Sequence, residues 1–323
     1  MNERVTGVTG HLRGPIRVIF NSAAGSKGGI QTNAVTKADI DAVLHDVGVE
    51  AEVCESSSAD AARGLAAEAV RDGYPIVVAA GGDGTVGIVA TELLSSEAAL
   101  GILPGGTIMN IARMLRVPRD LSAAAAVLAS GVVRRIDVGE VRGRPFFETA
   151  TVGLNAAMFR EAQRFADGDR MSIARAIWVA FRYRPARMRI ELEEGYVQTR
   201  ALTVTVSNGP YTGAGMTVAP EARLDDGRFD VTIFEHFSKL DLLRHFASIA
   251  FGRRKYVPHT STYRSTFARI SSAHPLPTRA DSRDLGTTPV EFRVLPAALR
   301  VVVPAHEPAA GDEWSPPGAG QRS

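Results

Sequence analysis

The feature that most constrains the fold is a short apolar strand that ends in a glycine-rich loop. Residues 75–80 are apolar at nearly every position and lead directly into Gly81-Gly82-Asp83-Gly84-Thr85. A strand that is apolar on both faces is typical of a parallel sheet covered by helices, and such sheets bind ligands at the carboxyl ends of their strands. Glycines let backbone N–H groups approach phosphate oxygens, and the following helix adds a favourable dipole. We therefore predict a phosphate-binding loop formed by Gly81, Gly82, Asp83, Gly84 and Thr85, rather than a tight turn that only joins a strand to a helix.

A second loop of the same kind follows the next predicted strand, at residues 100–103. It contains Pro104-Gly105-Gly106-Thr107 and leads into a helix that starts near Asn110. Two such loops on neighbouring strand ends should face each other, and their backbone N–H groups can form one anion-binding concavity. Asn21 ends the first predicted strand and is expected to form a third wall. These positions extend the predicted polyphosphate site to Asn21, Gly106, Thr107 and Asn110.

The order of predicted elements divides the chain of 323 residues into two domains. Strands and helices alternate over residues 15–135, which predicts an α/β, doubly wound, Rossmann-like nucleotide-binding domain. Alternating or β-branched runs dominate residues 136–303, which predicts a mostly-β sandwich interrupted by helices at 170–182 and 239–251. Residues 1–14 are expected to be flexible. Residues 304–323, rich in proline, glycine and charge, are expected to be a disordered tail.

Basic residues gather at two places although the net charge is only +2. Arginines are dense around residues 170–189, where Trp178 lies in an amphipathic helical pattern, and again at 253–255. Such helices favour peripheral contact with an anionic membrane, and helices covering the core with a solvated basic face explain the pattern equally well. The chain contains no recognisable base-reading module, so nucleic acid is not an expected partner.

Cysteine content and hydropathy indicate the compartment. The single cysteine, Cys54, cannot form an internal disulfide and offers no metal cluster, in agreement with a reducing environment. No run of residues reaches the apolar length of a spanning helix, and residues 1–14 lack the apolar core of a signal peptide. A cytoplasmic protein with at most peripheral membrane contact is therefore expected. The sequence is silent on oligomeric state.

Taken together, the motifs resemble the diacylglycerol kinase catalytic-domain family, which includes bacterial lipid kinases and sphingosine kinases. The resemblance covers most of the chain and rests on residues 21–26, 81–85, 103–113, 136–139, 147, 153–155, 208–216, 219–220, 224–227, 275–277 and 288–292. It implies a first domain with an NAD kinase or phosphofructokinase-like fold and an ATP-dependent transfer of phosphate to a lipid hydroxyl, on diacylglycerol or a related lipid. ATP and Mg²⁺ are the implied cofactors, with Thr107 and the residues of the first loop in the ATP site.

The resemblance also implies a structural magnesium site at the Asp-Asp-Gly turn. The matching ligands are the carboxylate of Asp226 and the backbone carbonyl oxygens of Arg223 and Arg228. Oxygen ligands of this kind suit a hard cation. A β-turn stabilised by aspartate side chains explains the same residues without a metal.

Several positions depart from the family pattern. Gly87 and Ile88 follow the first loop where the family has Asn and Glu, and Met109-Asn110 replaces an Asn-Asp pair. The family's proposed proton acceptor, a glutamate, is Arg283 here, and arginine stays protonated. Asp281 and Asp284 are the candidate substitutes.

Two alternatives therefore remain open beside a lipid kinase: a non-catalytic nucleotide- or lipid-binding protein, which Arg283 favours, and an NAD kinase-like enzyme. The sequence does not indicate which lipid is bound. Because Asp83 is placed in a polar loop outside the core, its replacement by alanine is expected to abolish ATP binding and to leave the fold intact.

Overall fold

A computed structural model of the chain describes residues 14–21, 26–27, 30–31, 35–106, 108–166, 171, 175, 178–179, 182–213, 215–235 and 260–306. The predicted flexible segment up to residue 13, the predicted helix at 239–251 and residues 307–323 of the predicted tail lie outside the described residues.

The chain divides into two compact units. The first contains Met1–Val138, Gly213–Met216 and Pro296–Ser323, and the second contains Gly139–Thr212 and Thr217–Leu295. The sequence had assigned residues 213–216 and 296–303 to the second domain, whereas their contacts group them with the first. The reason is that these segments add to a body formed mainly by distant parts of the chain, which the local pattern does not reveal.

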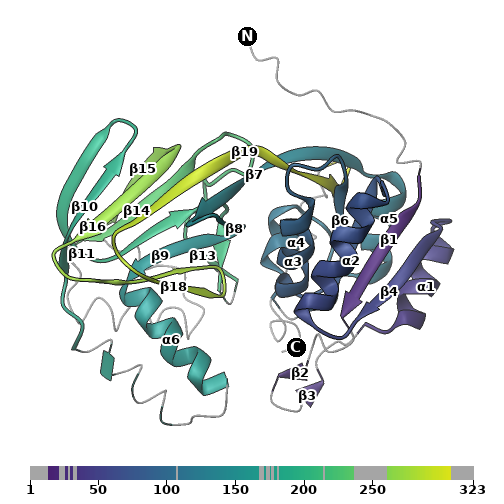
Figure 1. Ribbon diagram of the computed structural model, residues 1–323, viewed down its shortest axis with the longest axis horizontal. Helices are drawn as coiled ribbons and strands as arrows, with labels where there is room; N and C mark the ends of the chain where they lie inside the picture. Colours follow the sequence, from purple (N-terminus) through teal and green to yellow (C-terminus); the bar gives the residue numbers. More distant parts are fainter. Residues whose placement is uncertain are drawn as a thin grey trace, which may run out of the picture. The chain divides into compact units, whose positions relative to one another are not determined.

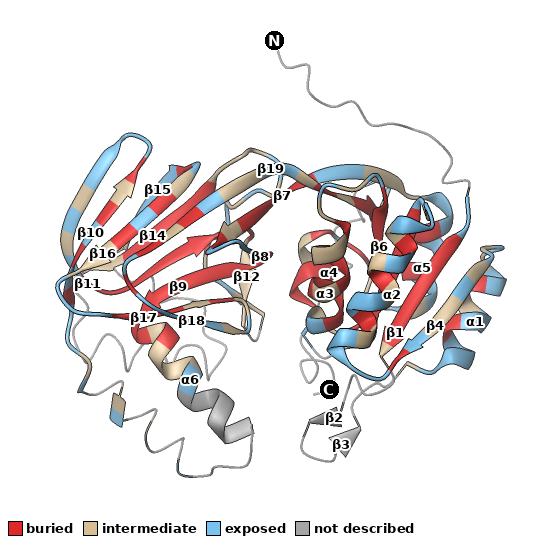
Figure 2. Ribbon diagram, in the orientation of Figure 1, coloured by how far each residue is buried: buried red, intermediate tan, exposed pale blue. Residues whose placement is uncertain are grey.

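The first unit is built on a parallel sheet with the strand order β19-β6-β5-β1-β4. Its members are β1 (Ile16–Asn21), β4 (Ala51–Ser56), β5 (Ile76–Gly81), β6 (Ala99–Pro104) and the end of β19 (Val290–Val303). Every residue of β5 and β6 is buried, as a central parallel strand requires. Figure 1 labels β1, β4 and β6 of this sheet, and Figure 2 colours the same view by burial. The chain runs from β1 to β4 on one side and then returns to β5 on the other. The neighbouring strands β1 and β5 thus form the topological switch point of the sheet.

Helices cover this sheet in two pairs. Helices α2 (Ala59–Arg71) and α3 (Asp83–Leu93) pack on each other and on the sheet, and so do α1 (Lys37–Asp46) and α5 (Leu121–Ser130). The short helix α4 (Asn110–Met114) contacts α3. Side chains that precede α1, α2 and α5 accept a backbone N–H of the first turn and cap these helices; they are Thr36, Ser58 and Asp120. The two-residue strands β2 (Ser26–Lys27) and β3 (Ile30–Gln31) pair with each other.

The second unit consists mostly of antiparallel strands. Its elements are β8 (Arg144–Phe146), β9 (Thr149–Gly153), α6 (Leu154–Ala166), β10 (Ala186–Leu192), β11 (Gly195–Ser207), β12 (Tyr211–Thr212), β14 (Phe229–Glu235), β15 (Thr260–Ser265), β16 (Phe267–Ser272), β17 (Pro277–Ala280) and β18 (Arg283–Thr287). Strands β7 (Val132–Val141) and β19 have residues in both units, and β13 (Met216–Thr217) begins where the inserted segment of the first unit ends.

The long strand β11 organises the second unit. Its first half pairs with β10, and its second half pairs with β9 on one edge and with β14 on the other. The core beneath these strands contains three fully buried phenylalanines, with the Phe146 ring stacked 5.6 Å from Phe229 and edge-on 6.1 Å from Phe292 between centroids. The prediction of a doubly wound domain followed by a mostly-β domain is thus confirmed.

Candidate active site

The carboxyl ends of three neighbouring strands meet at one edge of the first unit's sheet. Phe20 of β1 is in register with Ala80 of β5, and Gly81 of β5 is in register with Pro104 of β6. Asn21, the last residue of β1, therefore lies beside the start of the first glycine loop, and the second loop begins directly after Pro104. The parallel order predicted from the sequence brings these segments together at the switch point, where open α/β sheets bind ligands.

The two glycine loops touch through their backbones. The Gly105 N–H donates to the Gly81 carbonyl oxygen at 3.0 Å. A Cβ atom added to Gly106 would lie 2.7 Å from the Cα atom of Gly82 and 2.8 Å from the Met109 sulfur. Real side chains do not approach backbone atoms so closely, so the two loops can pack in this way only with glycine at position 106.

We expect Gly106→Ala to separate the two loops. Overpacking of a closed contact lowers the free energy of unfolding by about 1–3 kcal/mol, and displacement of the loop should also weaken the ATP binding that the sequence predicts. Urea denaturation and calorimetric titration with ATP measure the two effects. Gly64→Ala in α2 is the matched control, because a Cβ atom there meets nothing within 4 Å. A Gly106→Ala protein with the stability and the ATP affinity of the wild-type protein would show that the close contact between the loops is dispensable.

Asp83 connects the first loop to the helix after the second loop. Its two carboxylate oxygens accept the backbone N–H groups of Asn110 and Ile111, each at 3.0 Å. The N-cap of that helix, Met109, has a left-handed backbone (φ 56°) and provides no side-chain cap, so Asp83 caps α4 from a distant part of the chain. Burial raises the pKa of the Asp83 carboxyl, and the backbone hydrogen bonds partly offset that rise. The structure thus differs from the expectation that Asp83 lies in a polar loop outside the core and can be replaced without effect on the fold, because its carboxylate also caps α4.

The N-terminus of α3 has no side-chain cap. Its N-cap is Gly82, which carries no side chain, and the N–H groups of the first helical turn therefore face the loop without a capping oxygen. Gly84 is exposed, and a Cβ atom on it would meet nothing within 4 Å. Thr85 is buried beneath the loop, where its hydroxyl would lie 2.8 Å from a Cβ atom on Gly81. Backbone N–H groups and the positive end of a helix dipole together suit a phosphate group.

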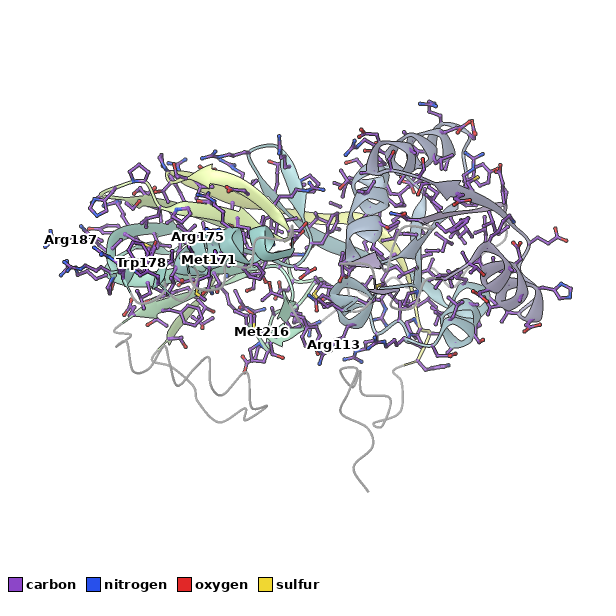
Figure 3. All side chains as sticks on the ribbon, turned by 90° about the horizontal axis from the view of Figure 1, so that it is seen from below. Arg113, Met171, Arg175, Trp178, Arg187 and Met216 are labelled. Carbon is purple, nitrogen blue, oxygen red and sulfur yellow. The ribbon has the colours of Figure 1, made fainter. Side chains whose placement is uncertain are left out.

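Asn110 and Arg113 on α4 hold a segment that is distant in sequence. The Asn110 side-chain amide donates to the Gly213 carbonyl oxygen at 3.0 Å, and the Arg113 guanidinium donates to the Gly215 carbonyl oxygen at 3.1 Å. Figure 3 labels Arg113 and Met216, which ends this segment. The sequence analysis did not predict these contacts. The local signal in the sequence is the pair of glycines at positions 213 and 215, which both have positive φ in the structure. Thr107, the other predicted residue of the second loop, lies outside the described residues.

Asp281 lies in the turn between β17 and β18, and Arg283 and Asp284 are the first two residues of β18. Asp281 has a left-handed conformation (φ 47°) and is partly buried, and its carboxylate accepts the N–H groups of Phe147 and Glu148 at 2.9 Å. Burial raises the pKa of this carboxyl. Asp284 is half-exposed and forms an ion pair with Arg160 at 2.6 Å. Asp281 therefore anchors the turn, and Asp284 is the carboxylate that solvent can reach.

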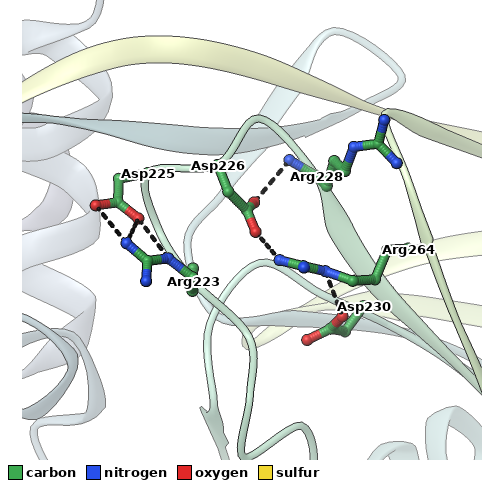
Figure 4. A network of polar contacts seen from close by, with 6 residues as sticks. All are labelled: Arg223, Asp225, Asp226, Arg228, Asp230 and Arg264. Carbon is green, nitrogen blue, oxygen red and sulfur yellow. Dashed lines mark hydrogen bonds and ion pairs between the residues drawn. The ribbon is translucent and has the colours of Figure 1, made fainter. Parts of the chain in front are cut away.

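The Asp226 turn lies in the second unit and is occupied by ion pairs (Figure 4). One carboxylate oxygen of Asp226 accepts the Arg228 N–H at 3.0 Å, and the other binds the guanidinium of Arg264. Asp225 is bound by the side chain of Arg223 at 3.0 Å. Both oxygens of the carboxylate that the implied metal site requires therefore already have a donor. The contacts of this turn therefore do not fit the implied structural magnesium site.

The described part of the predicted amphipathic helix exposes apolar side chains. Met171 and Trp178 are exposed, and the guanidinium of Arg182 lies 4.8 Å from the centroid of the Trp178 ring. Figure 3 labels Met171, Arg175 and Trp178 on this segment. Among the residues that the structure describes, no helix is both long enough and apolar enough to cross a membrane.

Comparison with protein families divides the chain in two. A family model described as the diacylglycerol kinase catalytic domain matches residues 15–141. A second model, described as the YegS C-terminal NAD kinase beta sandwich-like domain, matches residues 149–303. Together the two models match parts of both units, including the two glycine loops, the Asp226 turn and the residues Asp281, Arg283 and Asp284.

Comparison with individual proteins gives a consistent result. A protein of Pseudomonas aeruginosa named "Probable lipid kinase YegS-like" is 31% identical over 252 residues, which cover 76% of this chain and 82% of that protein. The protein of Bacillus subtilis named "Diacylglycerol kinase" is 25% identical over 294 residues, covering 89% and 96%. A crystal structure of a diacylglycerol kinase from Bacillus anthracis has the same fold, with a TM-score of 0.66 at 18% identity over 89% of this chain and 96% of that one.

Proposed function

We propose that this chain, which belongs to the diacylglycerol kinase catalytic-domain family, transfers the γ-phosphoryl group of ATP to a hydroxyl group of a lipid. Membership of the family supports the class of reaction. Diacylglycerol or a related lipid is the proposed acceptor, and Mg²⁺ is proposed to enter with ATP.

The observation that carries the proposal is the pair of glycine loops in backbone contact at the switch point of the sheet. Gly82 and Gly106 leave no side chain over the backbone N–H groups, and the N-terminus of α3 is uncapped by any side chain. A polyphosphate supplies the oxygens and negative charge that such a surface lacks. Asn21 and Gly84 are the other described residues that we place around the nucleotide.

Phosphoryl transfer depends mainly on positioning the phosphates and neutralising their charge. The loops supply backbone N–H donors, and Asp83 fixes the first loop against α4 through its two hydrogen bonds. Mg²⁺ bound to ATP would neutralise phosphate charge during the transfer. These contributions do not require a protein base, so a protein with Arg283 at the family's glutamate position retains most of the machinery.

Removal of the acceptor's proton is the step for which this chain is least equipped. We assign it to Asp284, because the carboxylate of Asp281 is held by two backbone N–H groups. Asp284 is already paired with Arg160, so this ion pair must open before the carboxylate can accept a proton from the lipid hydroxyl. Turnover should therefore be slower than in relatives that have the glutamate, since a well-placed base contributes on the order of 10²–10⁴-fold.

Incubation of the purified protein with radiolabelled ATP, Mg²⁺ and a panel of lipids in mixed micelles tests the proposal. Label transferred to a lipid is the expected result, and label transferred to NAD would instead favour an NAD kinase-like enzyme. A non-catalytic nucleotide-binding protein is the second candidate, and Arg283 is the residue that favours it. If the protein binds ATP but transfers label to no acceptor, it is a non-catalytic nucleotide-binding protein.

The proposed contact with anionic membrane gives a prediction for Trp178. Trp178→Ala should reduce sedimentation of the protein with phosphatidylglycerol vesicles several-fold, because an aromatic ring beside a guanidinium binds well at the membrane interface. Tyr196→Ala is a matched control, because Tyr196 is 58% exposed and Trp178 is 57% exposed. Each ring also has an arginine guanidinium over its face, Arg189 on Tyr196 and Arg182 on Trp178. Added salt should weaken binding of the wild-type protein. Equal losses in both variants, or equal binding to neutral vesicles, would contradict this contact.

A further inference from the structure

The strand pair β14 and β15 brings an arginine to the two carboxylates beside the Asp226 turn. Asp230 on β14 and Arg264 on β15 are in register as cross-strand neighbours. The Arg264 side chain extends past Asp230, where its Nε atom is 3.6 Å from the carboxylate, and its terminal nitrogen binds Asp226 (Figure 4). One guanidinium thus bridges a turn residue and a strand residue.

The Arg264 guanidinium partly neutralises the negative charge of two neighbouring carboxylates at this turn. Asp230 is only 5% exposed, and its carboxylate shares the Arg264 guanidinium with the carboxylate of Asp226. A buried carboxylate beside a second carboxylate is unfavourable unless a cation lies close to both. The neighbouring cationic side chains are committed elsewhere: Arg223 to Asp225, and Arg228 to Glu193. Among the described residues, Arg264 is the cation that meets both Asp226 and Asp230.

A divalent cation would have to compete for the same oxygen atoms. Mg²⁺ requires an octahedral shell of about six oxygen ligands at about 2.0–2.1 Å. At Asp226 one carboxylate oxygen accepts the Arg228 N–H and the other binds the Arg264 guanidinium. A metal ion there would lie against that guanidinium, and the two positive charges would repel each other.

We propose that the guanidinium of Arg264 takes the place of a metal ion at the Asp226 turn, so that this part of the fold is stable without a divalent cation. The bridge carries a fixed charge, because arginine stays protonated at all relevant pH values. The inference does not depend on the proposed transfer of phosphate, since it concerns only the stability of the second unit.

Thermal unfolding of the full chain without nucleotide tests this inference. The melting temperature of the wild-type protein should be the same in EDTA and in excess Mg²⁺. Arg264→Met should melt lower in EDTA by roughly 2–4 °C or more, and Mg²⁺ should restore part of that loss because the two carboxylates then lack a cation. The matched control is Arg269→Met on β16, a similarly exposed arginine that pairs with Glu291, and its melting temperature should not respond to Mg²⁺.

Two results would overturn the inference. The first is a wild-type protein that loses stability in EDTA and recovers it with Mg²⁺, which would mean that a metal occupies the turn despite Arg264. The second is an Arg264→Met variant that behaves like Arg269→Met in both solutions. If Arg264→Met does not fold, the response of the wild-type protein to EDTA decides, and Arg264→Lys, which retains the charge, should remain folded and insensitive to Mg²⁺.

Discussion

Replacing Asp83 with alanine is expected to remove measurable ATP binding and to lower the free energy of unfolding at the same time. The carboxylate holds the N–H groups of Asn110 and Ile111, and the alanine variant leaves both donors without their partner. Loss of a helix cap lowers stability by about 0.5–2 kcal/mol, and an unsatisfied buried N–H group costs about 1–3 kcal/mol. The first loop is then no longer fixed against α4, so the phosphate-binding geometry is lost together with the cap.

Isothermal titration with ATP and urea denaturation measure the two effects of the Asp83 substitution. Asp60→Ala is the matched control, because Asp60 also lies in the first turn of a helix but its carboxylate is exposed and pairs only with Arg63. Asp83→Asn should be intermediate, since its single carbonyl oxygen can replace only part of the bonding of the carboxylate. An Asp83→Ala protein that is destabilised but binds ATP with unchanged affinity would remove the loop from the nucleotide site.

Replacing Arg283 with glutamate is expected to raise turnover by about 10-fold to 100-fold, because a base contributes on the order of 10²–10⁴-fold when well placed. The substitution provides a carboxylate at the position where the resembling family has its proposed proton acceptor. It also removes a positive charge that lowers the pKa of Asp281. The gain should appear in kcat, while the affinity for ATP should hardly change.

Two further variants separate the new base from the lost charge. Arg283→Gln removes the guanidinium without adding a carboxylate, so it should give much less of the gain than Arg283→Glu. Asp284→Ala in the native background should lower turnover if Asp284 accepts the proton, and the effect on stability should be small because its ion pair with Arg160 is solvent-exposed. Turnover that is high in the native protein and unaffected by any of these changes would show that the turn does not supply the base.

The sequence was sufficient to predict the features that depend on local pattern. The continuous apolar runs at residues 75–80 and 100–103 indicated buried parallel strands, and the glycines after them placed the two loops at one sheet edge. The structure has both strands fully buried and both loops in contact. The alternation of elements likewise predicted a doubly wound domain followed by a mostly-β domain.

Contacts between distant parts of the chain could not be predicted in this way. The sequence alone indicates a loop position for Asp83, because the two backbone N–H groups that its carboxylate accepts lie 27 and 28 residues further along the chain. Asn110 meets Gly213 across 103 residues, and Arg264 meets Asp226 across 38. These pairings depend on the register of strands and on where loops return to the sheet. Local periodicity carries no information about either, so the same aspartates and arginines resemble ordinary surface charges in the sequence.

Hydrogen–deuterium exchange on the full chain, with and without Mg²⁺ and a non-hydrolysable ATP analogue, tests the central claim that the paired glycine loops hold the nucleotide. The account predicts slower exchange in peptides that cover residues 81–87 and 105–112, because phosphate oxygens would accept the N–H groups at the start of α3 and tighten the second loop around Asp83. Peptides from β15 and β16 should exchange at the same rate in both states. Unchanged exchange in both loops at a saturating concentration of the analogue would contradict the account.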